Sequence, residues 1–165
     1  MIVTCSIMLL AFVSKPFAYT LSAVDPAKGA VKAKLEQSTA VLQTKGKTST
    51  TSSSYTISGA KFVIRLKINE TVFQSLSDQT TGTLNPADYI NLYKLSIGKT
   101  NRTFAINNDG STNTMLIPLV FASYEPPFIY RVAPANGLAP GEYAFIDKST
   151  TTTIGNVTVW TFGID

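Results

Sequence analysis

The side chains able to carry chemistry are few in this sequence, and they exclude several reaction types. The 165 residues include no histidine and a single cysteine, Cys5. Without histidine the chain lacks the most common general base and cannot form a Ser-His-Asp triad. One cysteine allows neither an intramolecular disulfide nor a cysteine-based metal site. Catalysis would therefore fall to carboxylates, lysines, tyrosines and hydroxyls, and nothing in the sequence implies a cofactor.

The carboxylates are the remaining candidates for acid and base chemistry. A glycosidase needs two of them across a cleft, and the sequence brings no two of them together. Glu142 belongs to an alternating segment, so we expect it to face solvent as the outward partner of a strand. The other candidates are isolated along the chain: Asp78, Asp88, Asp109, Glu125, Asp147 and Asp165. No catalytic residue is predicted.

A calcium loop is suggested by "NNDGST", where Asn107, Asp109 and Ser111 have the spacing of oxygen ligands. Such a loop also needs a bidentate glutamate further along the chain. The segment that follows is apolar, so no metal site is predicted. The same residues tolerate positive φ, which makes this stretch a strong turn signal.

Four aromatic residues are the candidates for ligand binding. Together they could form a stacking platform for sugars, although aromatic residues in strands more often belong to a core. The segment "YEPPFIY", residues 124–130, places two prolines between aromatic residues and indicates a rigid, partly exposed loop suited to recognition. The candidates are Tyr124, Phe128, Tyr130 and Trp160.

The charge is mildly basic, with 14 lysines and arginines against 10 acidic residues. The basic residues are scattered, and only Arg65, Arg102 and Arg131 carry the guanidinium that is favoured for phosphate contacts. No nucleic-acid-binding motif is present. A nucleic-acid partner is therefore not expected.

The N-terminus has the pattern of a secretory signal peptide, for which we assign residues 1–23. Residues 2–13, "IVTCSIMLLAFV", form an apolar run that is too short for a membrane span. Ala18 and Ser22-Ala23 supply small residues at which cleavage could occur. Basic residues are missing before the run, which a start site placed too far downstream would explain. The prediction is an extracytoplasmic protein that meets the membrane only through export; the alternative is a buried N-terminal strand or helix.

Residues 24–54 are expected to be an N-terminal segment followed by a polar linker. Within it, residues 28–42 could form an amphipathic helix, or residues 40–43 could begin the first strand. Residues 44–54, "TKGKTSTTSSS", are polar and of low complexity, which is typical of a flexible loop.

Residues 55–165 have the pattern of a β-domain. Phe62, Ile64, Leu66 and Ile68 alternate with mostly basic residues, which predicts a half-buried antiparallel strand. Turn signals recur between short runs rich in Val, Ile, Thr, Tyr and Phe. About eight short strands at this spacing predict an all-β fold, a single antiparallel β-sandwich.

The stretch "LAPGEYAFI", residues 138–146, resembles the turn-to-strand element of immunoglobulin-like and fibronectin-type sandwiches. The resemblance implies structural roles for Pro140, Gly141 and Tyr143, with the tyrosine ring buried and its hydroxyl bonded to backbone a few residues upstream. The pattern "PGEYAF…FGID" also resembles small exported bacterial envelope proteins without an assigned activity. It covers about residues 90–165 and brings no catalytic residue with it.

The sequence thus favours an exported, non-catalytic protein that acts in binding or as a structural component of the envelope, with an envelope protein or a glycan as partner. One alternative is a carbohydrate-binding or carboxylate-based carbohydrate-active protein. Another is a subunit of a surface assembly that is joined by strand pairing.

Overall fold

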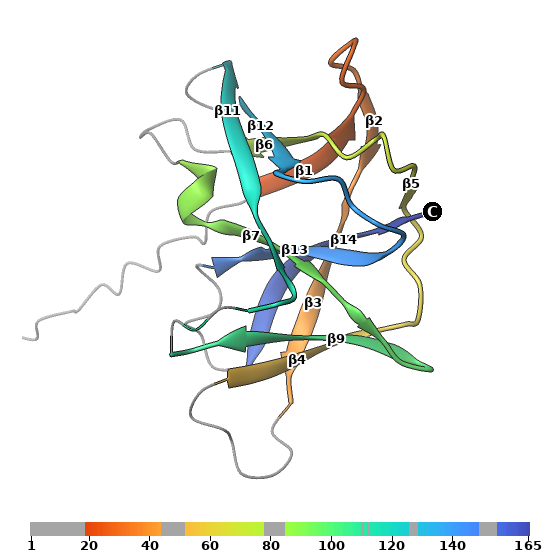
Figure 1. Cartoon of the computed structure of the whole chain (residues 1–165), viewed down its shortest axis with the longest axis vertical. Coiled ribbons are helices and arrows are strands. Elements are labelled where there is room, and N and C mark those ends of the chain that lie inside the picture. The colour runs from red at the N-terminus through yellow and green to blue at the C-terminus, as the bar shows by residue number, and fades with distance from the viewer. Residues whose placement is uncertain are drawn as a thin grey trace, which may run out of the picture.

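The computed structural model describes residues 19–43, 52–77, 85–109, 111, 113–125, 129–148 and 155–165. In these ranges the chain forms fourteen strands and one 3-10 turn, η1 (Pro86–Asp88). The strands make two sheets, and the predicted all-β, antiparallel architecture is confirmed (Figure 1). None of the described segments is a helix of the length and apolar character needed to span a membrane.

The smaller sheet has five strands, and all of its pairings are antiparallel. In spatial order they are β11 (Leu119–Glu125), β12 (Ile129–Pro134), β6 (Phe73–Ser77), β1 (Tyr19–Val24) and β2 (Val31–Lys34).

The larger sheet contains the remaining nine strands. Its spatial order is β10 (Leu116–Ile117), β7 (Ile90–Lys94), β13 (Gly141–Asp147), β14 (Asn156–Ile164), β3 (Glu36–Leu42), β4 (Ser52–Ser58), β9 (Asn101–Asn107) and β8 (Ser96–Ile97). The ninth strand, β5 (Arg65–Leu66), pairs in parallel with the end of β14.

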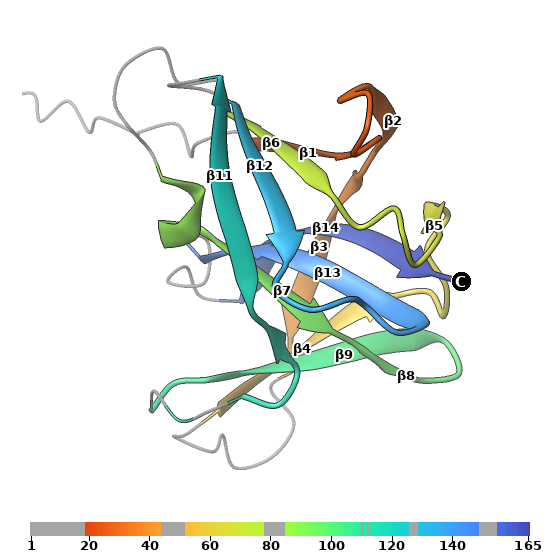
Figure 2. The ribbon, with the colours of Figure 1, turned by 45° about the horizontal axis from the view of Figure 1, so that its top comes forward.

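Three strands bend at a single residue, and these bends connect the two sheets and curl the larger one (Figure 2). At Leu35 the chain leaves β2 in the smaller sheet and enters β3 in the larger sheet, and at Pro118 it passes from β10 to β11. At Leu95 it passes from β7, which pairs with β13, to β8, which pairs with β9. The larger sheet therefore curls into a half-barrel. Strands that switch sheets at bends are a known way of making corners in packed sheets.

Two apolar cores result from this arrangement. The first lies between the sheets and includes Phe73, whose ring meets Phe145 edge-on at a centroid distance of 4.9 Å. The second lies inside the curl of the larger sheet and includes the stacked pair Tyr55 and Phe104. Alternate residues of β13 and β14 point into each core. Both strands are therefore buried on both faces, unlike a half-buried sandwich strand.

The architecture differs from the predicted single sandwich of eight strands. The sequence pattern resolves strands of four or more residues with flanking turns. It does not resolve two-residue strands such as β5, β8 and β10, or a strand that changes sheet at one residue. Of the alternating run 62–68, only Arg65–Leu66 pair as a strand, and Ile68 is exposed.

The predicted boundary at residue 55 is also wrong for the described part of the N-terminal segment. Strands β1, β2 and β3 and the first residues of β4 precede Tyr55 and belong to the two sheets. The helix considered for residues 28–42 does not form, and the strand expected from Ala40 begins at Glu36. The apolar run 2–13 and most of the predicted linker lie outside the described residues.

Candidate functional site

The candidate site is built around Glu142, the second residue of β13. Alternation along the strand puts this side chain on the same face as Ala144 and Ile146, inside the half-barrel. Its side chain is only 2 % exposed. The expectation that Glu142 faces solvent is therefore wrong, because one core lies on each face of β13.

Two arginines and a backbone group surround the Glu142 carboxylate. Arg65, on β5, forms an ion pair with Oε1 through Nη1. The backbone N–H of Phe62 donates to Oε2 at 3.1 Å. Arg102, on β9, holds Nη1 3.5 Å from the same oxygen. Charge-assisted contacts of this kind are what a buried carboxylate requires.

Arg65 also connects this group to Asp165. Its Nη2 lies 2.5 Å from Asp165 Oδ1, and its Nε donates to the same oxygen at 3.0 Å. The hydrogen bond from Arg65 lowers the pKa of Asp165, and the two acidic partners raise the pKa of Arg65. Arg65 thereby joins β5 to the end of β14.

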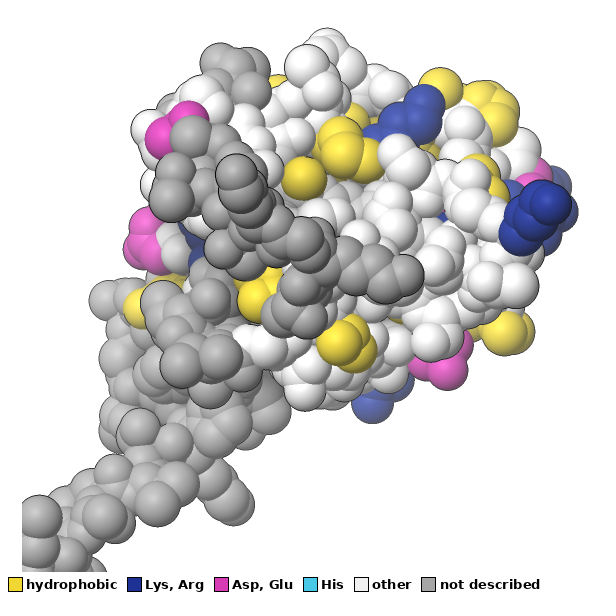
Figure 3. Space-filling view, turned by 90° about the horizontal axis from the view of Figure 1, so that it is seen from below, with side chains coloured by type: hydrophobic (Ala, Val, Ile, Leu, Met, Phe, Trp, Pro, Cys, Tyr) yellow, Lys and Arg dark blue, Asp and Glu magenta, His cyan; other side chains and the backbone are white. Residues whose placement is uncertain are grey.

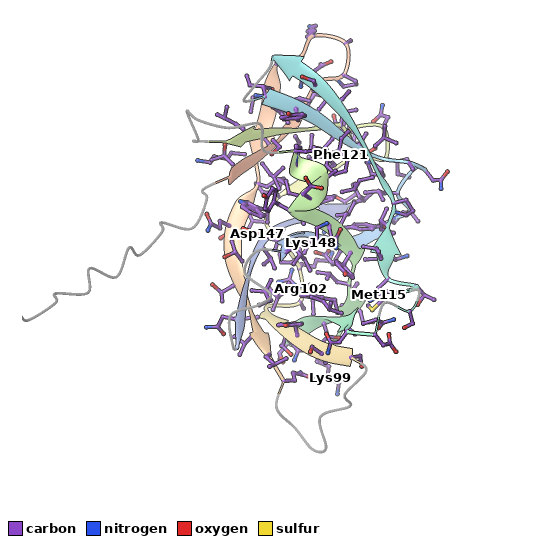
Figure 4. All side chains as sticks on the ribbon, turned by 90° about the vertical axis from the view of Figure 1, so that its left-hand side faces the viewer. Lys99, Arg102, Met115, Phe121, Asp147 and Lys148 are labelled. Atoms are coloured by element: carbon purple, nitrogen blue, oxygen red, sulfur yellow. The ribbon has the colours of Figure 1, made fainter. Side chains whose placement is uncertain are left out.

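Arg102 is the most deeply buried basic residue of the described chain, with a side chain 2 % exposed (Figure 4). Its Nη2 donates to the carbonyl of Ser58 at 2.6 Å, and its Cζ lies 3.2 Å from the centroid of the Phe62 ring. Nε and Nη1 have no hydrogen-bond partner. Burial lowers the pKa of Arg102, and Glu142 opposes that shift. A cation–π contact with a desolvated ring contributes on the order of 2 kcal/mol.

A small cleft of about 150 Å³ lies beside this cluster. It opens between β3, β4 and the loop that carries Phe62, and its polar lining includes Glu36, Ser38, Lys61 and Arg102. The cluster gives this cleft no free acid, because both oxygens of Glu142 are already engaged. Chemically, the arrangement suits holding a loop against the half-barrel better than transferring a proton.

A larger cleft, of about 400 Å³, lies elsewhere on the molecule. It is formed by the β1–β2 turn, residues 25–29, together with Val72 and Arg131. Arg131 Nη2 donates to the carbonyl of Gly29 at 3.3 Å, so the turn is held over the smaller sheet. Lys32 is bonded to Glu70 at 2.8 Å beside it. The charged groups here support the turn and do not converge on a common point.

The tyrosine predicted from "LAPGEY" has the expected geometry. Tyr143 is 1 % exposed, and its hydroxyl donates to the carbonyl of Ala139 at 2.7 Å. Gly141 begins β13, and Pro140 is exposed in the preceding turn. The ring stacks on Phe162 at a centroid distance of 5.6 Å. In this protein the tyrosine corner lies in a two-sheet fold whose larger sheet is a half-barrel.

The four aromatic candidates for ligand binding do not form an exposed platform among the described residues. Trp160 is 3 % exposed and belongs to the core between the sheets, which corrects its predicted role. Tyr130 is half-buried and shares a strand face with the buried Val132. Tyr124 is described only as part of β11, and Phe128 lies outside the described residues. The reason for the Trp160 error is that both faces of β14 are covered.

Hydrogen bonds link the described residues of the calcium-like stretch to one another. The amide of Asn107 donates to the carbonyl and the hydroxyl of Ser111, so it does not offer its oxygen there. Asp109 accepts from the N–H of Ser111 at 2.9 Å, and hydrogen bonding from the Ser111 side chain and backbone lowers the pKa of Asp109. Over the described ranges, no three acidic or cysteine side chains lie close enough to hold a metal ion.

The other acidic candidates do not gather into a second site. Asp147 is 2 % exposed and Asp88 is exposed at η1. Asp78 lies outside the described residues, and Glu125 is described only as the end of β11. Of these candidates, Glu142 and Asp165 share a partner, Arg65. Elsewhere in the described chain, Asp25 and Glu70 share Lys32.

The outer edges of the smaller sheet differ in charge. Strand β2, at one edge, carries Lys32 and Lys34 in four residues. Strand β11, at the other edge, has β12 on one side and is seven residues long (Figures 1 and 2). Residues 116–123 contain no charged side chain. Val120 on β11 and Val31 on β2 are 56 % and 58 % exposed.

The surface view shows no concentrated basic face. Lysine and arginine side chains occur as separate groups among uncharged and acidic ones on the face shown in Figure 3. This distribution matches the scattered charges of the sequence. The described side chains on this face form no stripe of the kind that nucleic-acid-binding proteins present.

Sequence reasoning did not identify Arg102 as a site residue. A signal was present in "NRTFAIN", because Arg102 is spaced two residues apart from Phe104, which is in turn two residues from Ile106. The arginine therefore shares a strand face with apolar residues. An arginine on an apolar face needs a buried acceptor. The acceptor, Glu142, comes from a strand forty residues later in the chain, and its identity required the structure.

The comparisons with known proteins give no relative from which a role can be taken. No protein-family model, no curated protein and no solved structure matches this chain.

Proposed function

We propose that the protein is an exported, non-catalytic component of the cell envelope that binds a partner chain by strand pairing along β11. The observation that carries this proposal is the outer edge of β11, which carries no charged residue before Glu125, the last residue of the strand. An edge strand offers a row of backbone N–H and C=O groups to an incoming strand. Side chains beside that row then select which strand binds.

The protective features found on most edge strands are placed outside the middle of β11. Natural proteins blunt such edges with lysines, prolines or bulges. Pro118 precedes the first residue of β11, and the register shift falls between Ser123 and Glu125, at its far end. Strand β2, by contrast, has two lysines. The smaller sheet thus has one protected edge and one edge suited to pairing.

The alternation of β11 indicates the partner's chemistry. Leu119 and Phe121 pack toward the core, whereas Val120 and Ala122 are exposed on the outer face. A strand added beside them would place its own side chains alternately on these two faces. The partner is therefore an extended, uncharged segment with apolar residues at alternate positions. Seven residues of β11 span about 24 Å.

Two further observations count against the carboxylate-based and the sugar-binding alternatives. The Glu142 carboxylate is taken up by Arg65 and the Phe62 N–H, so the carboxylate-based alternative has no acid in this cluster. The sugar-binding alternative named Tyr124, Phe128, Tyr130 and Trp160, and of these Trp160 is buried. Strand pairing uses neither Glu142 nor Trp160.

The test is site-specific photo-crosslinking in the native cell. A photoreactive residue at position 120 is compared with the same residue at position 31, because both valines are equally exposed and lie on opposite edges of one sheet. We expect a discrete adduct in the envelope fraction from position 120 and none from position 31. Val120→Lys should abolish binding of the adduct partner, and Val31→Lys should leave it unchanged.

The mass of the adduct identifies the occupant. A heterologous partner supports the proposal directly, and a mass of twice the chain identifies a second copy as the pairing partner. Equal adducts from both positions, or none from position 120, would show that β11 is not a binding edge. Recovery of the chain from the cytoplasm alone would contradict the export half of the proposal.

A further inference from the structure

We infer that export processing cuts the peptide bond between Ala18 and Tyr19, so that the mature chain begins at the first residue of β1. The inference rests on the export that is part of the proposed function. It is carried by the place of β1 in the smaller sheet, which the sequence pattern did not reveal.

The sequence alone does not choose among the candidate bonds. Signal peptidases prefer small residues at the first and third positions before the cut. A cut after Ala18 has Pro16 at the third position, and a cut after Ala23 has Leu21 there. A cut after Ser22 has Thr20 there. Each of the three bonds has a small residue at the first position before the cut. The third position holds Pro16, Thr20 or Leu21, so none of the bonds has the full pattern.

The structure distinguishes these bonds, because two of them fall inside an inner strand. Strand β1 lies between β6 and β2. It pairs with β6 from Tyr19 to Ala23 and with β2 from Ser22 to Val24. A cut after Ala18 leaves all of these pairs in place.

A cut inside β1 removes a strand that both neighbours need. Strand β6 would lose its partners on one side, and β2 would be separated from the rest of the smaller sheet. The carbonyl of Leu21 also accepts from the N–H of Leu35, the residue at which the chain turns into the larger sheet. Unpaired backbone groups in a sheet interior are rarely tolerated.

The charge of the new N-terminal amine also favours the cut after Ala18. Hydrolysis adds water across the amide bond, which leaves a carboxylate on the released segment and an amine on the mature chain. A cut after Ser22 or Ala23 would put that amine on Ala23 or Val24, both of which are 0 % exposed. A buried, unpaired ammonium is strongly unfavourable. At Tyr19 the amine lies at the end of the strand, opposite Ser77.

The test uses the full chain expressed in its own host. The envelope fraction is purified, and the N-terminus of the mature chain is read by sequencing and intact mass. We expect Tyr19 as the first residue. Ala18→Leu should block the cut and accumulate the precursor in the membrane fraction. Ala27→Leu, the same change at an exposed turn residue, should leave processing unchanged.

The outcomes separate this inference from the proposed function. A mature chain beginning at Val24, or at any residue within β1, would overturn the inference while leaving export intact. A chain that reaches the envelope with Met1 retained would also overturn it. Fractionation reads export independently, since an uncut chain found only in the cytoplasm contradicts the export proposal as well.

Discussion

The carboxylate of Glu142 accepts the backbone N–H of Phe62, a residue eighty positions earlier in the chain. The ring of Phe62 lies under the guanidinium of Arg102, which approaches the same carboxylate oxygen. Glu142 therefore fixes both the ring and the cation that covers it. Backbone hydrogen bonds hold the two ends of the loop between β4 and β5, from Gly59 to Thr100 and from Gly163 to Ile64, and Glu142 fixes the loop at Phe62 between them.

The first prediction concerns that attachment. Glu142→Gln keeps the shape of the side chain and removes the charge that Arg65 and Arg102 share. Breaking a buried pair leaves an uncompensated charge, so we expect the free energy of unfolding to fall by about 3 kcal/mol. Urea denaturation measures the change. Glu36→Gln, at the exposed rim of the cleft, should alter stability by less than about 0.5 kcal/mol.

A loss of less than about 1 kcal/mol for Glu142→Gln would show that Arg102 is held without the carboxylate. The double variant Arg102→Leu with Glu142→Leu extends the test. Replacing a buried pair by apolar residues is often close to neutral. The double variant should therefore be more stable than the sum of the two single changes predicts.

The second prediction concerns the Tyr143 corner. Tyr143→Phe removes the hydroxyl that donates to Ala139 and leaves the buried ring in place. We expect a loss of about 1 kcal/mol in unfolding free energy, with unchanged crosslinking from position 120. Thermal or urea denaturation measures the first quantity. A variant of full stability that no longer binds its partner would instead make the stretch 136–143 part of a binding surface.

The third prediction is a dependence on acid. Arg65 lowers the folded-state pKa of Asp165 below its unfolded value, so the pair contributes stability above the ordinary aspartate pKa of about 3.9. That contribution is lost as the pH falls through the folded-state pKa. Asp165→Asn should therefore lower the melting temperature slightly near neutral pH and not at all in strong acid. Equal effects at both pH values would contradict the pairing.

The fourth prediction is a loss of stability in alkali. Burial raises the pKa of Tyr55, Tyr93 and Tyr143. The folded state therefore resists ionisation, and stability is full below the unfolded tyrosine pKa of about 10. It falls as the pH rises from there through the raised folded values. Phenolate absorbance and loss of β-structure should rise together in a pH titration; early ionisation in a folded protein would contradict this burial.

The parts of the fold that follow local patterns were predictable from the sequence. Alternation, turn residues and β-branched content give the all-β, antiparallel class, and "LAPGEY" gives the buried ring and the backbone bond of Tyr143. Each of these depends on residues within a few positions of one another. Local chemistry is enough to determine them.

The parts that depend on distant contacts were not predictable. Glu142 looks outward-facing until a core is known to lie on each face of β13. Trp160 looks available for stacking until both faces of β14 are known to be buried. The switch of sheet at Leu35 occupies a single apolar residue between two strands, so no turn signal marks it. In each case the missing information is which strand lies next to which.

The position of β14 sets when this chain can fold. The strand is central in the larger sheet, between β13 and β3, and it is synthesised after every other described strand. Neither core can close before Trp160, Phe162 and their neighbours have emerged from the ribosome. We therefore expect nascent chains to stay unfolded until β14 has been synthesised, a state that a secretion channel for extended polypeptides can accept.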